Sequence, residues 1–106
     1  MLNKYALNHR YYNTQHEVDS IEDKFFLGDR LAPLLDQAWE HLEVHDYITL
    51  EREAAYMSSC ARVLRHWFLA DVSGMLALAA GYRDQERCEL FLAVMQWERR
   101  ESGGRG

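Results

Sequence analysis

Residues 49–81 carry the longest helical pattern in the chain, and this segment constrains the fold more than any other. Its apolar residues recur at alternating steps of four and three, the spacing that places side chains along one side of an α-helix. This line consists of Leu50, Ala54, Met57, Ala61, Leu64, Phe68, Met75 and Leu78. Asp71 is the one charged residue at a position of the line. The segment therefore predicts a helix.

The length of this helix is difficult to reconcile with a compact chain. A continuous helix of about 31 residues would be roughly 46 Å long, whereas a compact chain of this size has a radius of gyration of only about 13 Å. We therefore expect either a break near Ser73 and Gly74 or a second subunit that covers the protruding end.

Composition favours a single all-α domain. The chain has 106 residues, of which 48% are hydrophobic, and this is enough apolar surface for a packed core. One Pro and six Gly leave little turn chemistry for a sheet. We expect an N-terminal arm over residues 1–16, a helical domain over 17–101 and a disordered tail over 102–106. The expected fold is a small bundle of three to four helices built around one long helix, about residues 50–80.

Residues that stop or cap helices mark the expected boundaries. Asp29 and Thr49 are suitable N-caps for the helices that follow them, because their side-chain oxygens can accept hydrogen bonds from free backbone N–H groups. Gly81 is expected to end the long helix, and Asp84 to cap a last helix over residues 85–101.

The long segment has more apolar surface than one buried face requires. A second apolar line runs beside the first and consists of Tyr56, Cys60, Val63, Trp67 and Ala70. Together the two lines span roughly 200°, whereas a buried helix face needs an arc of about 100°. A small monomer would expose part of this area, and exposed apolar patches usually mark interaction sites. We therefore expect a homodimer, unless the other helices wrap the long helix completely.

The candidate partner or dimer interface combines this second line with the tyrosines of the arm. Tyrosine is enriched at contact surfaces, because fixing its large amphipathic ring loses little entropy. The candidate residues are Tyr5, Tyr11, Tyr12, Tyr56, Cys60, Val63 and Trp67.

Charge disfavours nucleic acid as a direct partner. Residues 17–53 hold eleven acidic side chains against three basic ones, a net charge of −8 within a chain whose total is −5. Such a band repels the phosphate backbone and attracts a basic protein. The simpler explanation of the acidic band is a solvated helix face that keeps the protein soluble.

Catalytic and cofactor motifs are absent from the sequence. It has no Gly-rich phosphate loop, no Gly-x-Ser-x-Gly elbow and no cysteine pair at redox spacing. Cys60 and Cys88 fall on apolar helix positions, where a free thiol behaves as a small hydrophobe, and this favours a reducing, cytoplasmic location. Neither a signal peptide nor a membrane span is expected. We expect no enzyme activity and no cofactor.

His41 and His45 are the candidate metal ligands in this sequence. Their i, i+4 spacing can start a metal site on a helix, but two ligands are too few. We expect both to be edge residues bonded to a carboxylate or water, and metal binding is kept as an alternative.

Three classes of function remain. The first is a small regulatory module that inhibits or sequesters a partner protein through apolar and aromatic helix faces. The second is a structural or assembly subunit, or a secretion chaperone. The third is a helical protein that binds a metal or a small ligand.

A resemblance makes the first class more specific. The chain is acidic, poor in cysteine and helical, and its segment LEREAAYMSSCARVLRHWFLADVSGMLALAAGY is a long apolar helix. In these features, across roughly residues 17–101, it resembles the small bacterial antiactivators that sequester LuxR-type quorum-sensing regulators. The resemblance implies that the protein binds the ligand-binding domain of such a transcription regulator, blocks its dimerisation and keeps it off DNA.

Overall fold

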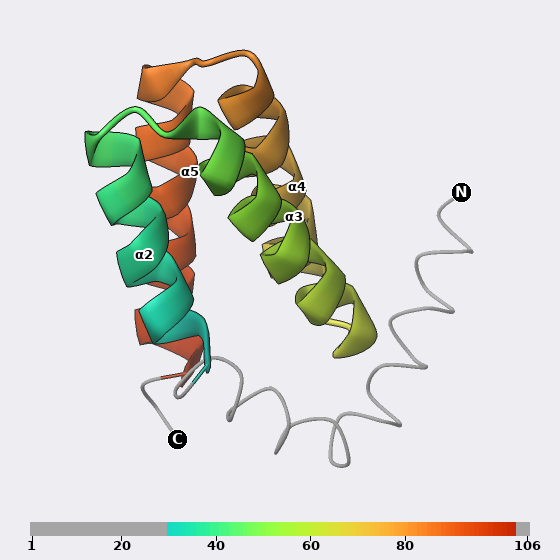
Figure 1. Ribbon diagram of the computed structural model, residues 1–106. Coiled ribbons are helices and arrows are strands. Elements are labelled where there is room, and N and C mark those ends of the chain that lie inside the picture. Colours follow the sequence, from blue (N-terminus) through green and yellow to red (C-terminus); the bar gives the residue numbers. More distant parts are fainter. Residues whose placement is uncertain (1–29, 104–106) are drawn as a thin grey trace, which may run out of the picture.

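The computed structural model describes residues 30–103, which form a bundle of α-helices (Figure 1). In chain order the elements are α2 (Leu31–Glu43), α3 (Tyr47–Val63), α4 (Trp67–Gly81), α5 (Gln85–Glu98) and the π-helical turn η2 (Arg99–Gly103). Within this range there is no strand. The expectation of a small all-α bundle is confirmed. The arm over residues 1–16, the expected cap Asp29 and the three tyrosines of the arm lie outside the described residues.

Residues 49–81 do not form one long helix. Helix α3 ends at Val63 and α4 begins at Trp67, so the expected helix over about residues 50–80 is wrong, and so is the expected break near Ser73 and Gly74. The length problem is solved by a reversal of the chain, with α3 and α4 packed side by side as the most extensive helix pair in the bundle (Figure 1).

The reversal at residues 64–66 is a compact hydrogen-bonded turn. The N–H of Arg65 donates to the carbonyl of Arg62 at 3.0 Å, and the N–H of His66 donates to that of Ala61 at 2.8 Å. This pair of bonds is the Schellman pattern, which requires a left-handed residue after the helix, and Arg65 has a φ of 61°. The turn therefore satisfies the last carbonyls of α3 without a glycine.

The same turn connects every consecutive pair of described helices. Residues 44–46, 64–66 and 82–84 share the same pattern of backbone hydrogen bonds. The middle residues, all at positive φ, are His45, Arg65 and Arg83. The third residue of each turn then caps the next helix through its side chain, which accepts a hydrogen bond from the backbone N–H three residues later. Three-residue turns of this kind make neighbouring helices antiparallel.

The capping residues agree only in part with the sequence-based predictions. Asp84 caps α5 as predicted, and α4 ends at Gly81 as predicted. Thr49 is not the cap of α3; instead its N–H donates to the carboxylate of Asp46 at 3.1 Å. The helix expected over residues 85–101 ends at Glu98, and η2 extends it by a wider turn that includes residues 102 and 103.

The helices close into a ring in which α2 contacts α3 and α5, and α4 contacts α3 and α5 (Figure 1). One hydrophobic cluster lies between them. Its buried members are Leu31, Leu35, Ala38, Leu42, Leu50, Ala54, Met57, Ala61, Leu69, Ala70, Val72, Leu76, Ala79, Ala80, Cys88, Leu92 and Met95. Each described helix thus buries one side in a common core.

Small residues allow α3 and α4 to approach closely. The buried hydroxyl of Ser58 on α3 donates to the carbonyl of Ala70 on α4 at 2.8 Å, and the buried hydroxyl of Ser73 donates to the carbonyl of Leu69. Gly74 lies beside Ser58, where an added Cβ would stand 3.7 Å from the serine oxygen. Gly74 is therefore part of a helix contact and not a helix break.

Candidate protein-binding surface

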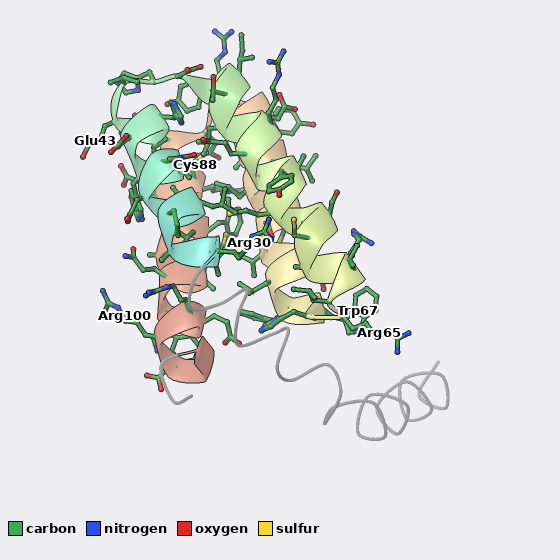
Figure 2. All side chains as sticks on the ribbon, turned by 60° about the horizontal axis from the view of Figure 1, so that its bottom comes forward. Arg30, Glu43, Arg65, Trp67, Cys88 and Arg100 are labelled. Atoms are coloured by element: carbon green, nitrogen blue, oxygen red, sulfur yellow. The ribbon has the colours of Figure 1, made fainter. Side chains whose placement is uncertain are left out.

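Helix α4 exposes an apolar line on the side opposite the core. The large side chains of this helix and of its C-cap residue Tyr82, with their exposed fractions, are Trp67 40%, Phe68 47%, Met75 43%, Leu78 65% and Tyr82 83%. We call these five residues the α4 apolar face. Residues 67, 71, 75, 78 and 82 succeed one another at steps of four, four, three and four, so they lie on one side of the helix. Figure 2 shows Trp67 and Arg65 at the end of the bundle where this face begins.

The turn at residues 64–66 explains why this face is exposed. In the sequence pattern the predicted apolar line continues through the turn. Its first four members, on α3, are buried: Leu50, Ala54, Met57 and Ala61. Its members on α4, however, are Phe68, Met75 and Leu78, which are exposed. The reversal changes the orientation of the helix, so α4 buries a different side, centred on Leu69 and Leu76. Helix α4 is thus apolar on both sides.

Asp71 lies in the middle of the α4 apolar face and is exposed. Although the sequence places Asp71 among apolar helix positions, its side chain is not enclosed, because the enclosed side of α4 is the other one. Among the described residues it forms no ion pair. Its carboxylate stays hydrated, which avoids the cost of a buried charge.

The four sequence-predicted interface residues that lie within residues 30–103 come from two different helices. Tyr56 and Val63 are exposed on α3, with Val63 80% accessible, and the hydroxyl of Tyr56 accepts a 3.4 Å hydrogen bond from Arg30. Cys60 is partly buried against the core. Trp67 stands on a different helix, beyond the turn. Of this set the structure places only Trp67 on the α4 apolar face, and the interface role of the set stays a prediction.

Sequence reasoning missed Phe68, Met75, Leu78 and Tyr82 as surface residues. A signal for the turn was present: an apolar residue, then His or Arg, then His or Asp, recurs at residues 44–46, 64–66 and 82–84. The third residue of each can cap a helix. Recognition of this repeated signal would have divided the long segment at the correct place.

A second exposed apolar surface lies on α5. Leu90 and Trp97 are both 56% exposed, and they are seven residues apart, about two helical turns. The core side of the same helix is formed by Cys88, Leu92 and Met95. Helix α5 therefore also has apolar side chains on two sides.

Of the three described histidines, His41 and His66 make contacts between elements distant in sequence, and His45 makes a local one. His41 Nδ1 lies 2.9 Å from Glu53 Oε1 and links α2 to α3, which agrees with the expected carboxylate partner. His45 is in a turn, so the i, i+4 spacing does not put it on the helix of His41; its ring stacks on Tyr47 at 6.0 Å. His66 Nε2 lies 3.6 Å from Glu98 Oε2. Within residues 30–103 no group of three potential ligands is arranged for a metal ion.

The two cysteines are free thiols in different environments. Cys88 is fully buried, and burial raises its pKa to about 11, with Asp84 and Glu89 adding to the effect. The nucleophilic form of cysteine is the thiolate. Cys88 is therefore a packing residue and not a reactive one.

Acidic side chains gather on α2 and near the start of α3. Asp36, Glu40 and Glu43 are exposed on α2. Hydrogen bonds from Thr49 hold the pKa of the Asp46 carboxyl below its usual range. This part of the predicted acidic band is a hydrated surface that is open to a charged partner.

None of the helices formed by residues 30–103 has both the length and the apolar character needed to cross a membrane. Comparison of the chain with known proteins found no matching family model, no matching curated protein and no matching solved structure. The α4 apolar face and its central carboxylate are therefore interpreted from their own chemistry.

Proposed function

We propose that this chain is a small regulatory protein that inhibits or sequesters a partner protein by docking its α4 apolar face on it. The observation that carries the proposal is the exposure of five large apolar side chains along one side of α4. Contiguous apolar patches on small soluble domains are associated with protein contacts. Three of the five are aromatic, and Trp and Tyr are the commonest residues to dominate binding energy at interfaces.

Asp71 restricts the partner to a surface of particular chemistry. A docked partner would remove water from this carboxylate, and burying it without a partner group would cost several kcal/mol. The fitting surface is therefore apolar with one Lys or Arg that reaches Asp71. The exposed acids of α2 favour the same class of partner, because they attract a basic protein over longer distances.

The mechanism is steric. A rigid helix face that occupies an apolar surface of the partner excludes whatever the partner normally binds there, including a second subunit. In its most specific form the proposal is that of an antiactivator: the partner is a LuxR-type quorum-sensing regulator in the bacterial cytoplasm, and the complex blocks its dimerisation and DNA binding. The support for this form is the overall resemblance described above together with the exposed apolar helix.

Capture from the native cell lysate tests the proposal. Immobilised full-length protein is compared with the variant Leu78→Lys, which places a charge in the α4 apolar face at an exposed position. A matched control is Ala55→Lys on α3, also exposed and outside both the face and the acidic side chains of α2. We expect the wild type and the control to retain the same protein in near-stoichiometric amount, and Leu78→Lys to lose most of it.

The identity of the captured protein then distinguishes the alternatives. A transcription regulator whose DNA binding in a gel-shift assay falls when this protein is added supports the antiactivator form. A secreted protein or a large assembly supports a chaperone or an assembly subunit instead. Equal capture by wild type and Leu78→Lys would remove the α4 apolar face from the proposal. Metal analysis of the purified protein tests the third class.

A further inference from the structure

Helix α5 carries a regularly spaced seam on its solvent side. The five residues follow steps of four, three, four and three, the spacing of a coiled-coil contact. We call them the α5 seam: Glu86, Leu90, Ala93, Trp97 and Arg100. All five are exposed. Figure 2 shows Arg100, which belongs to η2 just beyond the end of α5, with its side chain directed away from the bundle.

The order of residues makes the α5 seam of one copy complementary to the α5 seam of a second copy when the two helices run antiparallel. Ala93 is at its centre. Glu86 lies seven residues before it, about 10 Å along the α-helix at 1.5 Å per residue, and Arg100 lies seven residues after it, in the turn η2 that extends α5. Leu90 and Trp97 lie about 4.5 and 6 Å from the centre on opposite sides. When two copies meet about a two-fold axis at Ala93, Leu90 faces the Trp97 of the other copy, and Glu86 faces its Arg100.

We infer that the α5 seam is the contact between two copies of this chain in a symmetric, antiparallel homodimer. The charges of the seam favour a second copy of the chain as its partner. The seam has one acidic end and one basic end, and each end meets an opposite charge when two copies pair in the antiparallel direction. Parallel pairing would place Glu86 beside Glu86. The small Ala93 at the axis lets the helices approach closely. Among the described residues, neither Glu86 nor Arg100 forms an ion pair within its own chain.

The dimer is reversible. A single pair of four-turn helices buries less than the roughly 800 Å² per partner found in stable complexes, so dissociation in the micromolar range is expected. Leu90 and Trp97 supply most of the binding energy, since large apolar side chains at the centre of an interface dominate it. The exposed ion pairs contribute little energy and fix the direction. The contact is on a different helix from the α4 apolar face and does not depend on the proposed function.

Sedimentation equilibrium of the full chain, from micromolar to millimolar concentration, tests this inference. The mass should rise from that of the 12.5 kDa chain towards twice this value. Leu90→Glu and Ala93→Arg should each weaken association by more than about tenfold, because each puts a charge into the apolar centre. Both positions are exposed, so helix content measured by circular dichroism should not change.

Charge reversal tests the direction of pairing. Glu86→Arg and Arg100→Glu should each weaken association by up to about tenfold, because each brings like charges together at both ends of the seam. The double variant should recover the wild-type constant within about twofold, since opposite charges again face each other. The matched control is Leu78→Lys on α4, which should associate like the wild type.

Three results would overturn the inference: a monomer at every concentration, a dimer that withstands Leu90→Glu and Ala93→Arg, or a double reversal no better than the single ones. These outcomes are separable from the proposed function. A monomeric α5-seam variant that still captures the partner leaves the α4 proposal intact, whereas a dimeric wild type that captures nothing contradicts only that proposal.

Discussion

Cys88 shows how the local environment determines the chemistry of a side chain. The side chain of Cys60 is partly accessible to solvent, whereas that of Cys88 has no exposed surface. With the pKa of Cys88 raised to about 11, its thiol is protonated throughout the neutral range. The fraction present as thiolate is therefore very small.

Alkylation kinetics should separate the two thiols. Iodoacetamide at neutral pH should modify Cys60 quickly, and Cys88 only at the rate at which the bundle opens, because a protonated, buried thiol is not attacked directly. Mass spectrometry against time measures both rates. The variant Cys60→Ser should lose the fast phase; rapid modification of Cys88 in that variant would contradict the buried position.

Asp46 makes the stability of the first turn of α3 depend on pH. Hydrogen bonds from the side chain and from the backbone N–H of Thr49 lower the pKa of the Asp46 carboxyl from its ordinary value of 3.8. A carboxyl whose folded pKa is depressed stabilises the fold above its unfolded pKa, and this contribution is lost as pH falls through the folded value. The cap is therefore complete at neutral pH and lost in acid.

Substitution by asparagine isolates this effect. Asp46→Asn keeps a capping oxygen but cannot titrate, so its free energy of unfolding should fall less than that of the wild type when pH is lowered below 3.8. Urea unfolding at a series of pH values measures both. Parallel loss of stability in the two proteins would show that other carboxylates are responsible.

At the scale of elements, the turns and the α3–α4 contact define the bundle. Three turns of identical hydrogen bonding place a non-glycine residue at positive φ. This conformation costs roughly 1–2 kcal/mol for a residue with a Cβ. The turns are therefore sites where the sequence is not optimal for stability.

Arg83→Gly tests this cost at an exposed turn. We expect the free energy of unfolding to rise by up to about 1 kcal/mol, because relief of the strained φ exceeds the entropy that glycine adds to the unfolded chain. Arg83→Ala keeps the Cβ and should give no such gain. Urea midpoints measure the difference; equal stability of the two variants would argue against strain at this position.

Gly74 offers a second gain at a helix contact. An added Cβ would stand 3.7 Å from Ser58 Oγ, an ordinary contact distance, so alanine fits without a shift. Gly74→Ala should stabilise the protein by about 0.5–1 kcal/mol through helix propensity. The larger Gly74→Leu should destabilise it, because it would separate α3 from α4. A loss of stability with alanine would mean that the two helices lie closer than described.

At the scale of the molecule, one hydrophobic cluster joins the described helices. Leu76 is fully buried on the core side of α4, and α4 contacts both α3 and α5. Leu76→Ala should reduce stability by about 2–5 kcal/mol through lost burial and a cavity. Leu78→Ala on the exposed side of the same helix should cost under about 1 kcal/mol. Thermal unfolding of both variants measures this contrast, and similar losses would mean that α4 is buried on both sides.

The all-α fold class and part of the core could be predicted from the sequence alone. Helical spacing correctly indicated the burial of Leu50, Ala54, Met57 and Ala61, since these residues share one side of an uninterrupted helix. Asp84 marked the start of α5 correctly, because capping is a local interaction that depends on a few neighbouring residues. Helix α4 ends at Gly81 as predicted, although the left-handed residue of that turn is Arg83 and not the glycine.

Which side of α4 is buried depends on the packing of the folded chain and could not be predicted from the sequence. The helix is apolar on both sides, so its spacing allowed either Phe68, Met75 and Leu78 or Leu69, Val72 and Leu76 to face the core. Which side faces the core depends on the left-handed Arg65 at the turn and on packing against α3 and α5. The turn contains no glycine, so the sequence lacks the usual signal for a left-handed residue. Contacts between helices that are distant in sequence produce no periodic pattern of residues. For this reason the candidate binding surface could be identified only from the folded structure.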